Sequence, residues 1–369
     1  MTDRDYMERA IKLAEKGIGW TNPNPLVGAV IVKDGRIIGE GYHARYGELH
    51  AERNAIASLT ESAKGATLYV TLEPCCHYGK TPPCTEAILE QKIARVVIGS
   101  RDPNPKVSGK GAAILRKAGV SVEEDFMREE CDRLNPVFFH YITTNTPYVV
   151  MKYAMTADGK IATKTGASKW ITGSKAREAV HEMRHRYMGI MAGIGTVLAD
   201  DPMLNVRLAQ KRNPVRIICD SRLQIPIDSQ ICQSAGKYRT IMACTEDADE
   251  TKVNQLIKLG LEVVKIPALD GKVDIKKLAK YLGEIGIDSI LLEGGGTLND
   301  SALRAGIVQK IMVFLAPKVF GGALAKSPVA GCGVDIPEDA VMLKLENIHH
   351  IEEDILLEYG VKKRCLQEL

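Results

Sequence analysis

The stretch LVGAVIVKDGRIIGEGY, residues 26–42, carries the clearest secondary-structure signal in the chain. It begins with an apolar run at 26–32, continues with the turn dipeptide Asp34-Gly35, and ends with a second strand-like run at 37–42. Two such runs joined by Asp-Gly are typical of a β-hairpin. We therefore expect an antiparallel pair of strands near the beginning of the fold.

Helical and strand-like segments alternate around this hairpin. Met7, Ala10 and Ala14 recur at three- and four-residue spacing, which predicts a helix before it. Two strands followed by repeated helix–strand units predict a three-layer α/β sandwich. After the hairpin, helices are expected at 50–59, 85–91 and 112–118, and strands at 67–71, 95–98 and 120–124.

A domain boundary is expected at residues 141–147, a short polar stretch that ends in a proline. Because 369 residues are enough for two cores, we predict domains at 1–145 and 146–369. The second domain is also expected to be α/β, since its segments alternate in the same way. Its expected strands are 148–154, 189–193, 215–220, 240–244, 262–266, 289–292 and 310–316, and its expected helices are 174–186, 250–259, 274–285 and 298–305.

The composition is that of a soluble globular protein, with 45% hydrophobic and 26% charged residues. A net charge of +3 and only 5% aromatic residues argue against a nucleic-acid-binding surface. No apolar run is long enough to cross a membrane, and the charged N-terminus lacks the apolar core of a signal peptide, so we expect a cytoplasmic protein. In such a protein, clustered cysteines indicate metal binding or catalysis, and of the nine cysteines only Cys75, Cys76 and Cys84 cluster.

Three short motifs lie close together in the sequence: His50-Ala51-Glu52, Glu73-Pro74-Cys75 and Pro82-Pro83-Cys84. A histidine, a glutamate two residues later and two downstream cysteines form the signature of zinc deaminases. His50, Cys75 and Cys84 would give zinc three protein ligands and leave its fourth position open for water. Glu52 would take the proton of that water and return it to the substrate ring and the leaving ammonia.

Other interpretations of these motifs stay open at this point. A histidine and a glutamate at this spacing also occur on ordinary exposed helices, and cysteines near a histidine also form closed structural zinc sites. A closed site needs a fourth ligand, for which Cys76 or His77 is available. The complete set of motifs favours an open catalytic site.

Eight residues separate Cys75 from Cys84, in place of the C-x-x-C spacing of many zinc deaminases. Together with TLEPC at 71–75 and NPNPLVG at 22–28, this insert closely resembles the deaminase domain of the bifunctional riboflavin-biosynthesis deaminase/reductases. The resemblance implies a cytidine-deaminase-like α/β/α sandwich that deaminates 2,5-diamino-6-ribosylamino-4(3H)-pyrimidinone 5′-phosphate. It also implies a substrate pocket that includes Asn24, His77, Lys80 and Thr81. At position 76 this chain departs from the family pattern, because it has cysteine where the family often has serine.

The clearest signal in the second domain is LLEGGGTL at 291–298, a predicted strand, glycine turn and helix start. Such a turn presents backbone amides to a phosphate, although it is not the G-x-G-x-x-G fingerprint and an ordinary tight turn would also explain it. The glycine-bearing turn at 193–196 is a weaker signal of the same kind. Segments 157–162, 168–172 and 195–202 resemble the reductase domain of the same family, which is similar in fold to dihydrofolate reductase.

This second resemblance implies an NADPH-dependent reduction that delivers hydride to C1 of the ring-opened ribosyl group. Lys152 and Glu293 are the candidate proton donors, while packing of Trp170 in the core and solvation of the arginines stay open as alternatives. The implied cofactor residues are Ala154, Trp170, Thr196, Asp200, Ser221, Gly295, Gly296 and Thr297. The implied substrate residues are Lys152, Ser168, Arg184, Leu204, Arg207 and Glu293.

The main alternative function is a nucleic-acid or nucleoside zinc deaminase with an accessory binding domain. Such an enzyme needs a basic channel with stacking aromatics, which this composition disfavours. A zinc-stabilised binding protein without catalysis is a further alternative, which a zinc-bound exchangeable water would exclude. We expect one zinc ion per deaminase domain, a phosphorylated pyrimidine as small-molecule partner, no nucleic acid, no membrane and a homo-oligomer.

Overall fold

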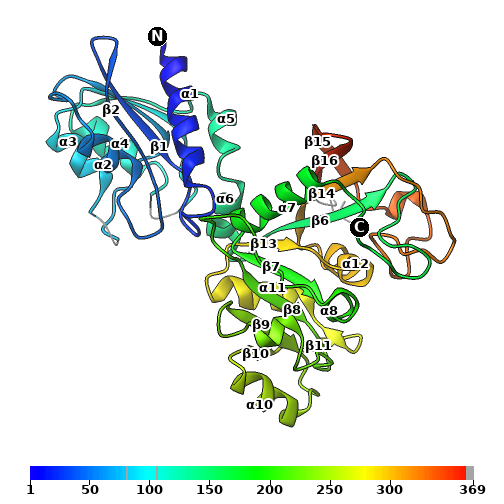
Figure 1. The fold of residues 1–369 in the computed structure, drawn as a ribbon. Helices are drawn as coiled ribbons and strands as arrows, with labels where there is room; N and C mark the ends of the chain where they lie inside the picture. The colour runs from blue at the N-terminus through cyan, green and yellow to red at the C-terminus, as the bar shows by residue number, and fades with distance from the viewer. Residues whose placement is uncertain (80–81, 105–106, 363–369) are drawn as a thin grey trace. The chain divides into compact units, whose positions relative to one another are not determined.

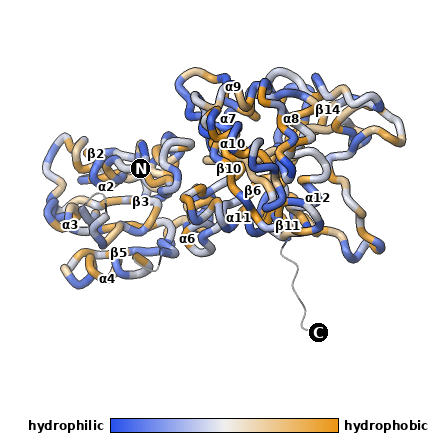
Figure 2. The backbone as a smooth tube through the Cα atoms, turned by 90° about the horizontal axis from the view of Figure 1, so that it is seen from below, coloured by the Kyte–Doolittle hydropathy of each residue, from blue (hydrophilic) through white to orange (hydrophobic). Residues whose placement is uncertain are grey.

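The computed structural model describes residues 1–79, 82–104 and 107–362. The chain divides into two compact units, residues 1–145 and 146–369 (Figure 1). Along the tube of Figure 2, hydrophobic and hydrophilic segments alternate in both units. Such alternation is typical of a chain whose strands are buried and whose helices expose one face. Among the described residues, no helix is long and apolar enough to cross a membrane.

The first unit contains a five-stranded mixed sheet in the order β2-β1-β3-β4-β5. The β1–β2 hairpin is antiparallel, and β1 is also antiparallel to β3, whereas β3, β4 and β5 are parallel. Asp34 and Gly35 both have positive φ, as the tight turn between β1 and β2 requires. The strands are β1 (Gly28–Lys33), β2 (Arg36–Tyr42), β3 (Thr67–Leu72), β4 (Arg95–Ser100) and β5 (Ser121–Glu123).

Helices cover both faces of this sheet. Val30 and Val32 of β1 pack with α1 on one face, and Ala29 and Ile31 pack with α2, α3 and α4 on the other. Because successive side chains of a strand point to opposite faces, one apolar strand serves both layers, and the predicted three-layer sandwich is confirmed. The helices are α1 (Asp3–Ala14), α2 (Ala51–Ala57), α3 (Cys84–Glu90), α4 (Lys110–Lys117), α5 (Arg128–Asp132) and α6 (Pro136–Thr144), with a 3₁₀ turn at Glu15–Gly17.

The second unit contains a nine-stranded sheet in the order β10-β9-β8-β7-β13-β6-β14-β16-β15. Neighbours from β10 to β14 are parallel, and β16 and β15 add an antiparallel edge. Its strands are β6 (Tyr148–Thr156), β7 (Gly189–Gly193), β8 (Val215–Cys219), β9 (Thr240–Cys244), β10 (Glu262–Lys265), β13 (Ser289–Leu292), β14 (Val308–Ala316), β15 (Leu343–Ile351) and β16 (Asp354–Val361). A separate small hairpin pairs β11 (Ala268–Leu269) with β12 (Lys272–Val273).

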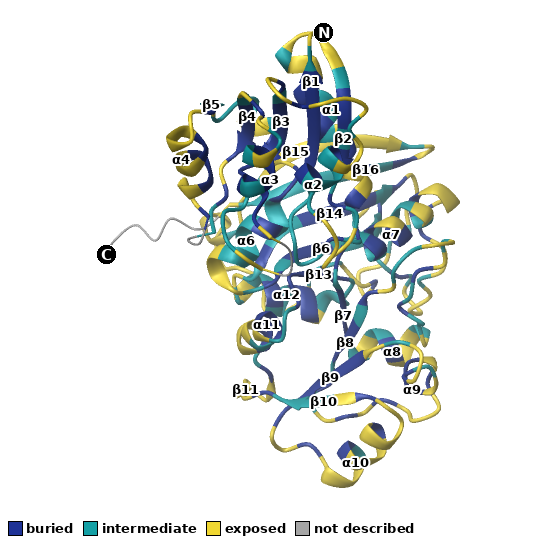
Figure 3. Ribbon diagram, turned by 90° about the vertical axis from the view of Figure 1, so that its left-hand side faces the viewer, coloured by how far each residue is buried: buried dark blue, intermediate teal, exposed yellow. Residues whose placement is uncertain are grey.

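Two apolar clusters lie on the two faces of this larger sheet. Ile217 of β8 packs with residues of α11 and α12, whereas its neighbour Ile218 packs with residues of α8, α9 and α10. Figure 3 shows the strands β8 and β9 as buried, with exposed surface on α10. The helices are α7 (Ser174–Arg186), α8 (Ile194–Asp200), α9 (Gln230–Gln233), α10 (Glu250–Lys258), α11 (Ile275–Glu284) and α12 (Gly296–Arg304), with a 3₁₀ turn at Pro337–Asp339.

Each helix and strand predicted from the sequence is present, and α7 has the predicted bounds. Within the polar stretch 141–147, where the domain boundary was expected, residues 141–144 form the last turn of α6. Pro136 is compatible with the first turn of that helix, where no backbone donor is needed. The glycine-bearing turn at 193–196 instead opens the short helix α8. The hairpin β15–β16 was not expected.

Candidate active sites

The predicted metal ligands come from three different elements of the first unit. His50 is the N-cap of α2 and has extended backbone angles, Cys84 is the first residue of α3, and Cys75 lies in the loop after β3. Gly41 of β2 allows α2 to lie close, since a Cβ at this position would be 2.3 Å from the amide nitrogen of Ala55. The helix starts of α2 and α3 therefore bring His50 and Cys84 to the end of the sheet where Cys75 emerges.

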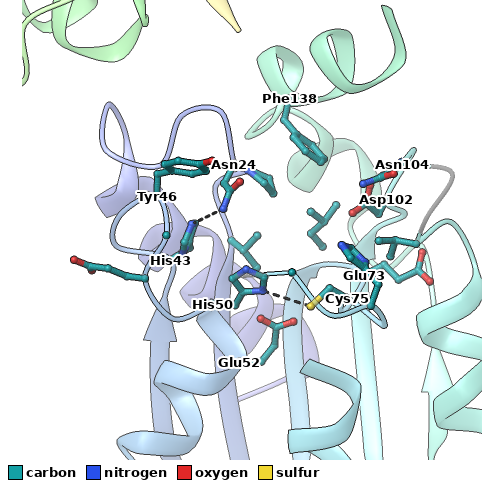
Figure 4. A pocket seen from close by; sticks show the side chains of 18 residues that line it. Asn24, His43, Tyr46, His50, Glu52, Glu73, Cys75, Asp102, Asn104 and Phe138 are labelled. Atoms are coloured by element: carbon teal, nitrogen blue, oxygen red, sulfur yellow. Dashed lines mark hydrogen bonds between the residues drawn. The ribbon is translucent and has the colours of Figure 1, made fainter. Parts of the chain in front are cut away.

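The ligand atoms of His50, Cys75 and Cys84 lie within 4.8 Å of one another. The Sγ atom of Cys75 is 3.5 Å from Nδ1 of His50 (Figure 4). The Sγ atom of Cys84 is also 3.5 Å from Nδ1 of His50. A tetrahedral zinc ion with ordinary Zn–N and Zn–S bond lengths would separate these atoms by about 3.6 Å. The three side chains therefore fit zinc, and Cys76 is not part of the cluster.

Glu52 lies next to this cluster and points toward it from the first turn of α2 (Figure 4). Only 3% of its surface is exposed. Burial raises the pKa of Glu52 to about 7, and the negative charge of Cys75 adds to the effect. A carboxyl group with such a pKa can both accept and donate a proton near neutral pH.

Hydrogen bonds hold the two cysteine-bearing loops. Arg53 of α2 donates to the carbonyl oxygens of Pro82 and Pro83 at 3.1 and 2.8 Å. The carboxylate of Glu73 accepts the backbone N–H groups of Gly109 and Gly111, both at 3.0 Å, where α4 begins. Negative charge at a helix N-terminus is stabilising, so α4 anchors the loop that carries Cys75.

A cavity of about 260 Å³ opens above the cluster. Asn24 and His77, two of the predicted substrate residues, line it. Nδ1 of His77 is buried and has no hydrogen-bond partner among the described residues. The other two predictions, Lys80 and Thr81, lie outside the described residues.

The cavity also contains polar residues that the sequence analysis did not single out. His43 is bonded through Nδ1 to the carbonyl of Leu49 at 3.0 Å, which leaves Nε2 to accept from the amide of Asn24 at 3.2 Å. Burial lowers the pKa of His43 and so favours this neutral form. Asp102 is 7% exposed, and burial raises its pKa to about 6. Both residues follow a strand, but neither belongs to a motif that would have marked it.

The second unit has a cavity of about 910 Å³ at the carboxyl ends of its parallel strands. The Ser168 hydroxyl donates to the Asp200 carboxylate there at 3.0 Å. Ala154 and Trp170 do not line the cavity; Ala154 is half-buried on β6, and Trp170 is 60% exposed with the Arg177 guanidinium 4.6 Å from its ring centre. The predicted residues that do line it are Ser168, Thr196, Asp200, Ser221, Gly295, Gly296 and Thr297.

Three other predicted residues form a buried ionic cluster. Arg184 pairs with both carboxylate oxygens of Glu293, at 2.8 and 2.9 Å, and Nζ of Lys152 lies 3.9 Å from the same carboxylate. Burial alone would raise the pKa of Glu293, but the charges of Arg184 and Lys152 outweigh it and hold the pKa at about 2. Burial lowers the pKa of Lys152. Glu293 is therefore ionised, and Lys152 is the better proton donor of the two.

The last two predicted substrate residues lie near this cluster in sequence or in space. Nε of Arg207 lies 3.2 Å from Nε2 of His181. Leu204 is buried with a positive φ of 48°. The carbonyl of the next residue, Asn205, accepts from Arg184 at 3.0 Å. This loop is thereby tied to the ionic cluster.

Two family models match the chain. The "cytidine and deoxycytidylate deaminase zinc-binding region" matches residues 1–100, and the "RibD C-terminal domain" matches residues 147–357. The chain is 56% identical to the riboflavin biosynthesis protein RibD of Actinobacillus pleuropneumoniae, with 98% of this chain and 96% of that protein covered. It is 40% identical to the Escherichia coli protein of the same name, with 97% and 99% covered.

Solved structures agree with these matches. The Acinetobacter baumannii RibD structure, form 1, superposes with a TM-score of 0.88 at 36% identity and covers 98% of this chain and 99% of that one. A deaminase/reductase structure from Thermotoga maritima gives 0.86 at 40% identity, with 97% and 98% covered. The predicted fold class is confirmed, and the matches over both units decide against a nucleic-acid deaminase with an accessory binding domain. The chain belongs to the RibD family of riboflavin-biosynthesis proteins and is a bifunctional deaminase/reductase.

Proposed function

We propose that residues 1–145 perform the deamination and residues 146–369 the reduction. The substrate of the first step is 2,5-diamino-6-ribosylamino-4(3H)-pyrimidinone 5′-phosphate, and the second step converts the ribosyl group of the product to ribityl. The single observation that carries this proposal is the convergence of His50, Cys75 and Cys84 within 4.8 Å beside the buried Glu52.

His50, Cys75 and Cys84 would hold a zinc ion in the deaminase unit. Zinc would supply a water molecule with its pKa lowered to about 7, so that a nucleophile exists at neutral pH. Glu52 takes one proton from the attacking water and passes it to the pyrimidine nitrogen, and it then carries the second proton, from the hydroxyl formed by the addition, to the amine that leaves as ammonia. Asn24 and His77 orient the pyrimidine, because both line the cavity above the cluster.

In the reductase unit, NADPH would supply the hydride, and the residues of this chain would orient it. The glycine turn Gly294–Gly296 and the start of α12 present backbone amides to the cofactor phosphates. Lys152 delivers a proton to the ring-opened ribosyl group, and Glu293 keeps Lys152 in place by its charge. A cytoplasmic location and a homo-oligomeric state stay predictions.

The role proposed for Glu52 is tested with a variant that removes its proton-carrying carboxyl group and keeps the three proposed zinc ligands. Glu52→Gln is expected to retain zinc and to lose about 10²- to 10⁴-fold in ammonia release, because proton transfer is removed. NADPH oxidation with the deaminated substrate should be unchanged. Glu61→Gln, an exposed carboxylate of the same unit, is the matched control. Normal ammonia release by the zinc-loaded Glu52→Gln variant would show that the role given to Glu52 is wrong.

A further inference from the structure

The cavity of the second unit has an uneven distribution of charge. Among its described lining residues, Asp200 is the one carboxylate, and it is bonded to Ser168. Three cations line the same cavity: Arg222, Lys272 and Lys326. Arg222 and Lys272 belong to one group of lining residues, 219–224 and 271–275, whereas Lys326 belongs to the loop 325–330.

The sheet order shows where these groups lie. The cavity is lined by residues that follow β8, β7 and β13 and by the loop 161–168 that follows β6, and these four strands are consecutive neighbours. Four neighbouring strands span roughly 14 Å, at about 4.8 Å per interval. Figure 1 shows α8, α12 and β11 along this one side of the sheet. An elongated ligand can therefore lie across the strand ends from β8 to β6.

The reacting end of such a ligand is fixed by the ionic cluster. Lys152 is on β6 and Glu293 directly follows β13, so hydride transfer belongs to the β6–β13 side. The glycine turn after β13 and Thr196 after β7 occupy the middle. The end of the cofactor opposite the nicotinamide therefore extends toward β8, where Ser221, Arg222 and Lys272 line the cavity.

The two cations at this end are carried by well-fixed backbone. The buried carboxylate of Asp220 accepts the N–H of Ile225 at 2.9 Å and so closes the turn that bears Arg222. The Ser221 hydroxyl accepts the N–H of Val273 at 3.0 Å, which joins the β11–β12 hairpin to the end of β8. Among the described residues, neither Arg222 nor Lys272 has a carboxylate partner within 4.0 Å. Both charges are available to an anion.

We propose that Arg222 and Lys272, with the hydroxyl of Ser221, bind the 2′-phosphate of NADPH and so determine the preference for NADPH over NADH. A phosphate dianion suits an arginine fork beside a lysine point charge, and an arginine commonly accommodates this phosphate in other nucleotide-binding folds. The inference rests on the proposed function, in which this cavity holds the nicotinamide cofactor.

The proposed 2′-phosphate site is tested by isothermal titration calorimetry on the full-length protein, with NADPH, NADH, 2′,5′-ADP and ADP as ligands. Arg222→Gln and Lys272→Gln are each expected to raise the Kd for NADPH and 2′,5′-ADP about tenfold, the loss of one charge-assisted contact. The Kd for NADH and ADP should stay within about twofold, because neither carries the 2′-phosphate.

Two controls remove the same charge elsewhere. Lys280→Gln, on the exposed face of α11, should change no Kd. Lys326→Gln, in the same cavity but on the other loop, should change the Kd values for NADPH and NADH by the same factor. If Lys326→Gln removes the NADPH preference as strongly as Arg222→Gln, the cations act as a general field and the inference fails.

The binding data distinguish a failure of the 2′-phosphate site from a failure of the proposed cofactor site. Wild-type protein that binds NADPH, with Arg222→Gln and Lys272→Gln variants that bind it equally well, would overturn the inference and leave the cofactor site standing. Equal weakening of NADPH and NADH in these variants would overturn it as well. Wild-type protein that binds neither nucleotide would overturn the proposed cofactor site and the inference together.

Discussion

Glu293 shows how buried charges decide the state of a single residue in this protein. Its carboxylate is bonded to Arg184 and lies near Lys152, so that the three side chains share one more positive than negative charge. Removal of one partner from a buried ion pair leaves an uncompensated charge, which costs about 3–5 kcal/mol. The cluster is therefore sensitive to any change at Glu293.

The low pKa of Glu293 predicts how the stability of the protein depends on pH. Its pKa is about 2 in the folded protein against an ordinary value of 4.5, so its stabilising contribution is fully present above pH 4.5 and is lost as the pH falls toward 2. Glu293→Gln should lower the free energy of unfolding by about 3 kcal/mol at pH 7. The gap to wild type should narrow between pH 4.5 and the lowest pH at which the protein stays folded, as measured by urea unfolding. A gap that is independent of pH would contradict the assignment.

At the scale of elements, α4 contributes to the metal site although it carries no ligand. Its first turn donates to Glu73, two residues before Cys75, and Gly111 packs against the backbone of Pro74. A Cβ at position 111 would lie 2.2 Å from the carbonyl oxygen of Pro74, too close for either backbone to remain in place. The position of the Cys75 loop therefore depends on a glycine in a different element.

Gly111→Ala is accordingly predicted to weaken zinc binding about 10- to 100-fold, the usual size of an effect that acts through the support of a ligand. Zinc affinity is measured by competition with a chromogenic chelator. Gly236→Ala is the control, because a Cβ at that position meets open space. Unchanged zinc affinity of Gly111→Ala would mean that α4 does not position the loop.

Local sequence signals were sufficient for the core elements and for the three side chains that converge at the proposed zinc site. The hairpin at 26–42 consists of two strand-like runs joined by an Asp-Gly turn, and the three side chains of the proposed zinc site belong to short local motifs. The sequence of β15 carries no comparable strand signal, because its apolar residues do not keep a spacing of two along the strand. This agrees with its position at the edge of the sheet, where seven of its nine residues are exposed. The pairing of Arg184 with Glu293 spans 109 residues and arises from the fold. His43 and Asp102 reach the cavity for the same reason.

At the scale of the whole molecule, all three predicted zinc ligands lie within residues 1–145. Removal of zinc by a chelator is therefore predicted to abolish ammonia release and to leave NADPH oxidation with the deaminated substrate within about twofold of its original rate. Restored ammonia release after zinc addition is the control for reversibility. A parallel loss of both activities would show that the reductase unit depends on the metal.

The apolar clusters also separate by unit: two contain residues up to 142 only, and two contain residues from 149 onward only. No buried side chain of these clusters serves both cores. A substitution in one of these clusters therefore disturbs the packing of the core of its own unit. In evolutionary terms, fusion or fission of the two halves of the gene would require no redesign of these apolar interiors.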